Sequence, residues 1–274
     1  MSESQRAESI APGITGEMAD YYDLFVDWKG RLGREMPGIE KRLRDNEARR
    51  VLDLGCGTGR HVEALLGAGF DAVGADKSDD MLRRAAALLG GRERLHTWRA
   101  GDAPPESLLS AAPFDAVICM GNTWPQIRPS EDLARTAASL QRLLRPGGLV
   151  LLGLKAFAVR QAEGNPYMPL LRRERDGTPY WFVRFVDFDV EPLEDGAPLC
   201  ETHMTVVCGD ASGEAETKAL LHRAGRSRVW SPDGLVRWFE AQGFERVRVG
   251  SRLDDPAAPV TGEDVYVEAV APSP

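Results

Sequence analysis

A glycine-rich loop between a short apolar strand and a helix constrains this chain more than any other feature. The segment from Val51 to His61 reads VLDLGCGTGRH and places glycines at positions i, i+2 and i+4. Glycine lets the backbone turn tightly and leaves room for a ligand to lie against it. The helix that follows presents free N–H groups to an anionic group. The loop therefore predicts a nucleotide-like ligand at the carboxyl end of the first strand.

Two residues narrow the kind of ligand. A dinucleotide fingerprint needs a small residue at position 60, where the helix packs on the strand, whereas this chain has Arg60, which disfavours a nicotinamide dehydrogenase. Asp76 ends the second predicted strand, where a carboxylate can bind both ribose hydroxyls. A ligand with a ribose and a carboxylate but no pyrophosphate suits this loop, and S-adenosylmethionine is such a ligand. The alternative, a tight turn with incidental glycines, is disfavoured by the strand and helix on either side.

Short apolar strands alternate with helices after an N-terminal region, Glu17–Leu43, that is predicted to form one or two helices. This alternation predicts a parallel sheet wound with helices on both faces. Strands are predicted at Arg50–Gly55, Phe70–Ala75, Leu95–Ala100, Phe114–Met120 and Gly148–Leu154, and helices at Gly59–Leu66, Ser78–Leu89 and Ser130–Leu144.

The pattern changes after the fifth strand. Tyr180–Phe188 and Leu199–Val207 alternate without intervening helices, which indicates antiparallel strands. A helix at Ser231–Gln242 and strands at Phe244–Val249 and Asp264–Val270 follow. The predicted fold class is α/β, a Rossmann-like doubly wound seven-stranded sheet with an antiparallel β insertion after strand five. The predicted segments are a flexible leader (1–16), an N-terminal helical cofactor lid (17–45), a cofactor-binding core (46–156), a lid and antiparallel insertion (157–228), and a C-terminal helix and strands that complete the core (229–274).

Composition excludes several classes of protein. With 43% hydrophobic and 28% charged residues the chain has the balance of a soluble globular protein. Its 34 basic and 42 acidic residues give a net charge of −8, which disfavours a nucleic-acid partner. The longest apolar stretch, Leu149–Val159, is interrupted by Lys155 and predicts no membrane span. Four separated cysteines and a polar first segment favour the cytoplasm, and no cluster has the spacing of a metal site.

The motifs from Arg50 to Leu154 resemble those of class I S-adenosylmethionine-dependent methyltransferases. Asp53–Gly59 resembles the first motif of that family and Asp76 resembles its ribose acid. The run Gly101-Asp102-Ala103 resembles the loop whose acid faces the adenine amino group, and Leu143–Leu149 resembles the turn before the fifth strand. The resemblance implies S-adenosylmethionine as cofactor, with S-adenosylhomocysteine as product.

A narrower resemblance is to the glycine/sarcosine N-methyltransferase-like group. It rests on Tyr21–Trp28, on Met120–Thr123 and on the antiparallel insertion. In that group an N-terminal Tyr and Arg close over the cofactor, and a Gly-Asn pair lies beside the sulfonium and the substrate. The cofactor-binding residues that the resemblance implies are Tyr22, Trp28, Arg31, Asp53, Gly55, Cys56, Gly57, Asp76, Lys77, Met81, Asp102, Ala103, Met120 and Gly121.

One position departs from the pattern of that group. Its glycine-methylating members have an Arg-Asn-Tyr run after strand five that binds the substrate carboxylate, whereas this chain has Lys155-Ala156-Phe157. Lysine is a point charge and lacks the planar fork of arginine. The departure puts glycine or sarcosine as the acceptor in doubt.

Three residues are the catalytic candidates. Asn122 ends strand four and is predicted to orient the acceptor. Lys155 ends strand five as an anion clamp or, equally, as a solvated lysine. His203 is either a general base for a hydroxyl nucleophile or, as is more common for one histidine on a strand, structural. The candidate substrate contacts are Tyr167, Tyr180 and Arg184.

The predicted activity is methyl transfer to the N or O atom of a small metabolite by direct in-line displacement. A positioned nucleophile needs little further help from side chains, because the methyl group of the cofactor is already activated. Two alternatives remain open: an enzyme such as a cyclase that binds the cofactor without passing on its methyl group, and a non-catalytic binding module. The predicted partner is a small-molecule acceptor, with no nucleic acid or membrane, and a homo-oligomer is possible.

Overall fold

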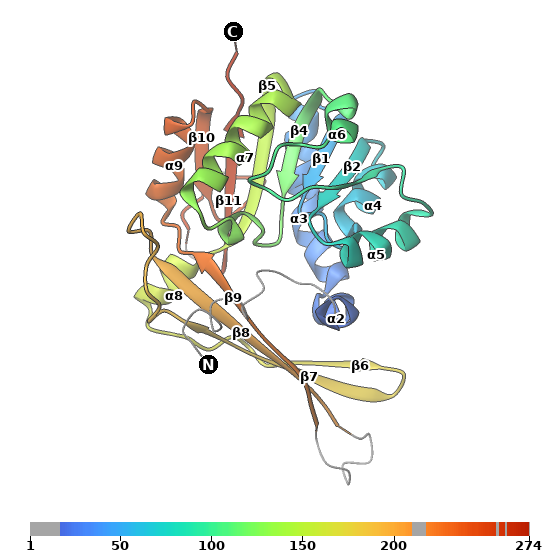
Figure 1. The fold of residues 1–274 in the computed structure, drawn as a ribbon, viewed down its shortest axis with the longest axis vertical. Coiled ribbons are helices and arrows are strands. Elements are labelled where there is room, and N and C mark those ends of the chain that lie inside the picture. The colour runs from blue at the N-terminus through green and yellow to red at the C-terminus, as the bar shows by residue number, and fades with distance from the viewer. Residues whose placement is uncertain (1–16, 210–217, 256–257, 261, 274) are drawn as a thin grey trace.

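The computed structural model describes residues 17–209, 218–255, 258–260 and 262–273. The predicted leader, 1–16, lies outside the described residues. Figure 1 shows a central sheet with helices on both faces and a second, smaller sheet beside the carboxyl ends of its parallel strands. The chain therefore folds as a layered core with one inserted sheet.

The central sheet has seven strands in the order β10-β11-β5-β4-β1-β2-β3. Only β11 runs antiparallel to its neighbours, β5 and β10. The chain moves from β3 at one edge to β4 beside β1, so the strand order reverses between β1 and β4. Such a reversal opens a crevice at the carboxyl ends of the strands. The strands are β1 (Arg50–Leu54), β2 (Asp71–Asp76), β3 (Leu95–Thr97), β4 (Phe114–Cys119), β5 (Leu144–Lys155), β10 (Glu245–Gly250) and β11 (Asp264–Val270).

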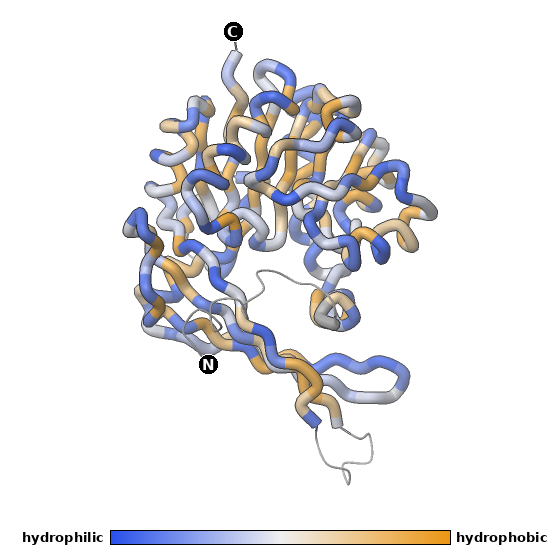
Figure 2. The backbone as a smooth tube through the Cα atoms, in the orientation of Figure 1, coloured by the Kyte–Doolittle hydropathy of each residue, from blue (hydrophilic) through white to orange (hydrophobic). Residues whose placement is uncertain are grey.

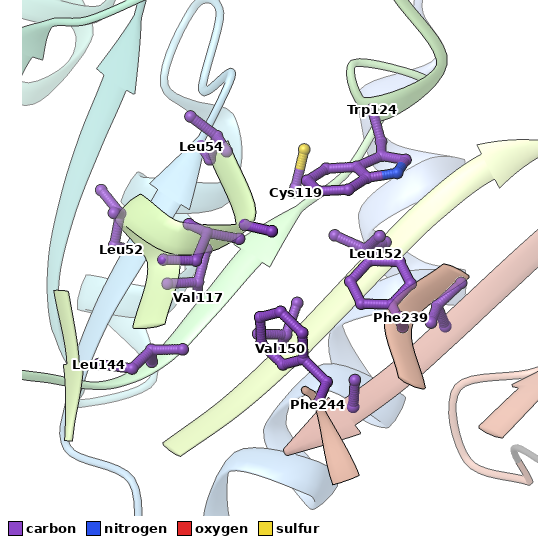
Figure 3. Packing of buried hydrophobic residues seen from close by; sticks show 14 of the residues in the cluster. Leu52, Leu54, Val117, Cys119, Trp124, Leu144, Val150, Leu152, Phe239 and Phe244 are labelled. Carbon is purple, nitrogen blue, oxygen red and sulfur yellow. The ribbon is translucent and has the colours of Figure 1, made fainter. Parts of the chain in front are cut away.

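Two hydrophobic clusters cover the two faces of this sheet, because successive strand residues point to opposite sides. Leu52 and Val117 pack with α6, α7 and α9 on one face, and their neighbours Val51 and Ala116 pack with α3, α4 and α5 on the other. Figure 3 shows part of the first cluster, and Figure 2 shows hydrophobic residues concentrated along the central strands. The helices are α3 (Trp28–Asp45), α4 (Arg60–Gly67), α5 (Asp79–Leu89), α6 (Glu106–Ala111), α7 (Ser130–Leu143) and α9 (Pro232–Ala241).

The insertion after β5 begins with α8 (Phe157–Ala162) and forms a four-stranded antiparallel sheet in the order β6-β7-β8-β9. The predicted strands Tyr180–Phe188 and Leu199–Val207 are confirmed as β7 (Thr178–Asp187) and β8 (Leu199–Cys208). The edge strands β6 (Leu171–Arg175) and β9 (Lys218–Arg228) were not predicted.

The first described helix, α2 (Glu17–Phe25), lies between the core and the inserted sheet (Figure 1). Its Phe25 ring packs against Phe182 of β7 with centroids 5.5 Å apart, and Tyr21 packs against Tyr180 at 5.9 Å. This helix and the insertion thus meet above the carboxyl ends of the parallel strands.

Candidate active site

The glycine loop between β1 and α4 is built around Asp76 at the end of β2. Gly55, Gly57 and Gly59 have φ angles of 75°, 54° and 81°. The backbone N–H of Gly57 donates to Oδ2 of Asp76 at 2.9 Å, and the N–H of Ser78 donates to Oδ1 at 2.9 Å. Burial raises the pKa of Asp76, and these two backbone hydrogen bonds oppose the rise. One carboxylate therefore fixes the loop that the glycines allow to turn.

A cavity of about 210 Å³, here called the loop cavity, lies against this loop. Asp76, Gly55 and Gly57 line it, and Met81 and Ile127 add apolar surface. A carboxylate can accept hydrogen bonds from a ribose, bare glycine backbone allows close approach, and an apolar slot suits a purine. The residues present thus fit S-adenosylmethionine.

A second cavity of about 330 Å³, here called the insertion cavity, lies between the core and the inserted sheet. It is lined from α2 and α3, from the ends of β4 and β5, and from β8 and β9. Tyr22, Gly121 and Gln126 line both cavities. The two cavities therefore meet at these three residues.

Hydrogen bonds of the neighbouring residue Asp23 help to hold Tyr22 at this junction. Oδ1 of Asp23 accepts hydrogen bonds from Thr58 of the glycine loop and from the Trp28 indole, both at 2.8 Å. Burial raises the pKa of Tyr22, against an opposing effect of the Arg31 guanidinium. The Tyr22 hydroxyl therefore stays protonated and can act as a donor between the two cavities.

A buried ionic network supports the start of α3. The Nε of Arg31 lies 3.1 Å from Oε2 of Glu35, and the same oxygen lies 2.8 Å from Nε2 of His61. Burial would raise the pKa of Glu35, but the hydrogen bond to His61 and the charge of Arg31 hold it below its usual value. The network joins α3 to α4 and holds Arg31 at the wall of the insertion cavity.

Asp53 lies beneath the glycine loop and is almost completely buried. Its Oδ2 has no hydrogen-bond partner among the described residues. Burial raises the pKa of Asp53 to about 6, although His61 and Arg31 oppose the rise. A buried carboxyl group with one unpaired oxygen thus lies directly behind the loop.

Half of the predicted cofactor residues line the loop cavity. Asp102 and Ala103 lie outside both linings; the Asp102 carboxylate pairs with Arg99 at 2.9 Å, and Arg99 itself lines the loop cavity. Arg31 lines the insertion cavity, and Trp28, Asp53, Cys56 and Met120 line neither. The predicted residues that line the loop cavity are Tyr22, Gly55, Gly57, Asp76, Lys77, Met81 and Gly121.

The predicted catalytic residues Asn122 and Lys155 lie together at the wall of the insertion cavity. Asn122 has a φ of 69°, and its Oδ1 accepts a hydrogen bond from the backbone N–H of Lys155 at 3.0 Å. The Nζ of Lys155 lies 2.7 Å from Oδ1 of Asp264. The amide is thus held in one orientation, and the lysine charge is already paired.

His203 of β8 is among the residues that line the insertion cavity, although the alternation of the strand turns its ring away from the side of Thr202 and Met204. Side chains alternate along β8, so His203 and its cross-strand neighbour Phe185 lie opposite Thr202 and Met204. The ring stacks on Phe185 with centroids 4.5 Å apart, and Nε2 lies 3.3 Å from Oε1 of Glu201. These contacts hold the His203 ring against the inserted sheet.

The three predicted substrate contacts lie in different surroundings. Arg184 lines the insertion cavity. Tyr180 packs on Tyr21 under the Arg175 guanidinium, outside both cavities. The side chain of Tyr167 is 73% exposed and also lies outside both. In the described conformation only Arg184 reaches the cavity.

Several lining residues were not predicted. Gln126 lies in the short helix η1 (Trp124–Gln126) after the Gly-Asn pair, Tyr266 on β11, and Arg223 on β9. Proximity to Gly121 could have indicated Gln126, whereas no local pattern marks the other two. Among the described residues no group of His, Cys, Asp and Glu side chains could hold a metal ion. Nor does the described part of the chain contain a helix of the length and apolarity that a membrane span needs.

Comparisons with known proteins agree with this geometry. Residues 51–148 match the family model of a methyltransferase domain. The dTDP-3-amino-3,4,6-trideoxy-alpha-D-glucopyranose N,N-dimethyltransferase of Streptomyces venezuelae is 31% identical over 230 residues, which cover 81% of this chain and 92% of that relative. The crystal structure of DesVI from Streptomyces venezuelae has a TM-score of 0.69 and 25% identity, and the match covers 94% of this chain and 99% of that chain.

A shorter match is to the glycine/sarcosine N-methyltransferase of Parasynechococcus marenigrum (strain WH8102). It is 33% identical over 159 residues, or 55% of this chain and 56% of that relative. The chain thus spans about half the length of the glycine/sarcosine N-methyltransferases that it matches.

Proposed function

Since the chain belongs to the class I S-adenosylmethionine-dependent methyltransferases, we propose that it transfers a methyl group to an amino nitrogen of a small metabolite. The meeting of the two cavities at Tyr22, Gly121 and Gln126 carries this proposal. A cofactor in the loop cavity and an acceptor in the insertion cavity would have their reacting atoms at this junction.

The residues of the chain act mainly by binding and orienting. When bound, S-adenosylmethionine supplies a methyl group that is already activated by its positively charged sulfur. Asp76 and the glycine loop would hold its ribose end, and Tyr22 lines the junction from α2. Asn122, fixed by the backbone of Lys155, orients the acceptor. Such positioning can contribute about 7–11 kcal/mol to lowering the barrier.

The surroundings of the junction favour nitrogen over oxygen as the acceptor atom. A hydroxyl acceptor needs a base, and the two basic candidates already have partners: Lys155 pairs with Asp264, and the His203 ring stacks on Phe185 and lies 3.3 Å from Glu201. Burial raises the pKa of Tyr266, which keeps that phenol protonated as well. An amine that is neutral at the working pH needs no such base. The relatives described above are also N-methyltransferases by name.

The proposal is tested by incubating the purified protein with S-adenosylmethionine and separate pools of amines, alcohols and carboxylic acids. Mass spectrometry follows S-adenosylhomocysteine and products heavier by one CH₂ unit. We expect both species with the amine pool and neither with the alcohols. Methylated alcohols or acids would contradict transfer to nitrogen, and cofactor binding without any methylated product would favour an enzyme that does not pass on the methyl group.

A further inference from the structure

Two arginines on the inner face of the inserted sheet have no carboxylate partner among the described residues, although the Arg184 guanidinium lies 5.0 Å from the centroid of the Phe25 ring. Arg184 of β7 and Arg223 of β9 both line the insertion cavity. The Nε atom of each is buried and has no hydrogen-bond partner among the described residues. Arg184 donates from Nη2 to the carbonyl oxygen of Pro169 at 3.2 Å, which leaves Nε unsatisfied. Buried donors without partners are costly, so their presence at a cavity wall indicates a ligand.

The strand register brings these two arginines to one place. Arg184 pairs with Met204 across β7 and β8, and Met204 pairs with Arg223 across β8 and β9. The three residues form one row and share the face that lines the cavity. Two strand spacings separate the backbones of Arg184 and Arg223 by about 10 Å. Arginine side chains are long enough to span this distance above Met204. Both guanidinium groups can therefore reach one group of a ligand.

The other basic residues of the lining differ from this pair. Arg31 pairs with Glu35 at 3.1 Å, Lys155 with Asp264 at 2.7 Å, and Arg226 with Glu201 at 2.8 Å. Arg34 is exposed to solvent.

Arg184 and Arg223, by contrast, form no ion pair with any carboxylate of the described residues. Burial lowers the pKa of Arg184, against an opposing effect of the Glu263 charge, which reflects the cost of removing a cation from water. The cavity wall thus carries unpaired positive charge in a chain whose net charge is −8.

We propose that the acceptor is an anionic amine, whose carboxylate or phosphate group is bound by Arg184 and Arg223 while its amino group lies at the junction of the cavities. This inference rests on the proposed function and names the class of its substrate. Guanidinium groups bind both oxyanions through paired hydrogen bonds, so carboxylate and phosphate share the recognition chemistry. The arginines would then select the acceptor and set its direction in the cavity.

The test measures binding of simple oxyanions to the protein saturated with S-adenosylhomocysteine. Calorimetry uses malonate and inorganic phosphate as probes, with malonamide as the neutral counterpart of malonate. We expect at least one oxyanion to bind the wild-type protein, and Arg184→Gln and Arg223→Gln each to weaken that binding roughly tenfold or more. The matched control Arg172→Gln, on exposed strand β6 of the same sheet, should bind like the wild type. The probe that binds identifies the oxyanion as carboxylate or phosphate.

Three results would overturn the inference: no oxyanion binding to the wild type, binding by both variants as tight as that of the wild type, or malonamide binding as tightly as malonate. Arg223→Lys keeps a positive charge and should retain part of the affinity, which separates charge recognition from a folding defect. Binding of S-adenosylhomocysteine is measured on every variant. If the wild type does not bind S-adenosylhomocysteine, the proposed function fails. If it binds S-adenosylhomocysteine but neither malonate nor phosphate, only the anionic acceptor is rejected.

Discussion

The carboxylate of Asp76 both holds the glycine loop and lines the loop cavity. It accepts backbone hydrogen bonds from Gly57 and Ser78, and it faces the loop cavity. We predict that Asp76→Ala weakens S-adenosylhomocysteine binding by about 1–3 kcal/mol, because hydrogen bonds to a charged acceptor are lost. Calorimetry measures the change. Asp71→Ala, at the exposed start of the same strand, should bind normally, and equal affinity in the two variants would contradict the assignment.

Asp53 should make the folded protein sensitive to pH. Its pKa rises from 3.8 to about 6 because it is buried, so the folded state holds the proton more tightly than the unfolded state. This stabilisation is complete below the unfolded pKa and is lost as the pH rises through the folded pKa, a change of up to about 3 kcal/mol.

We predict that Asp53→Asn, relative to the wild type, gains unfolding free energy between mildly acidic and neutral pH. Urea denaturation of both proteins across this range measures the difference. A difference that does not change with pH would show that Asp53 ionises in the folded state as it does in the unfolded state.

A sequence motif predicts the position of a single residue well only where the motif itself requires a particular backbone conformation there. Gly55, Gly57 and Asp76 could be read from the sequence because a turn and a strand end fix their positions. The face on which His203 lies depends on a one-residue register in β8, which no local pattern sets. Arg223 lies in a hydrophilic strand without a motif, so only the sheet pairing with Met204 brings it to the cavity.

The glycine loop tolerates no side chain at its first turn. A Cβ at Gly55 would lie 2.5 Å from the Thr123 side chain, and the φ of 75° is left-handed. We predict that Gly55→Ala loses at least about 1–2 kcal/mol of stability and weakens S-adenosylhomocysteine binding. At Gly67, in α4, an added Cβ meets no atom within 4 Å, so Gly67→Ala should be neutral or slightly stabilising. Equal urea midpoints for the two variants would contradict the account of the loop.

Helix α2 depends on the inserted sheet for its place above the junction. Phe182 of β7 is fully buried and packs against Phe25 of α2. We predict that Phe182→Ala costs about 3–5 kcal/mol in urea denaturation and weakens S-adenosylhomocysteine binding, because α2 carries Tyr22. Val183→Ala changes the exposed face of the same strand and should cost less than about 1 kcal/mol. Unchanged cofactor affinity in Phe182→Ala would show that α2 is held by other contacts.

The elements that the sequence predicts are those with a hydrophobic pattern. The strands β1, β2, β4 and β5 are confirmed because their apolar residues pack on both faces of the central sheet. The edge strands β6 and β9 have mainly exposed or half-buried residues, so neither shows a clear apolar alternation. Their pairing with β7 and β8 is a tertiary effect that hydropathy does not reveal.

At the scale of the whole molecule, the core and the insertion form different parts of the candidate site. The seven-stranded core provides the loop cavity, and the family model matches only within it. The inserted sheet provides the wall of the second cavity, including Arg184 and Arg223. The sequence predicted the class of fold and the methyltransferase family, and both are confirmed. The acceptor depends on the insertion, where side chains from distant strands meet.

The most direct test of methyl transfer to nitrogen locates the transferred group. The protein is incubated with S-adenosylmethionine carrying a deuterated methyl group and with the amine pool, and the product is fragmented in the mass spectrometer. Our account predicts the intact labelled methyl group on the amino nitrogen of an acceptor, with one S-adenosylhomocysteine formed for each methyl transferred. A labelled methyl group on oxygen or carbon, or consumption of the acceptor without label, would contradict it.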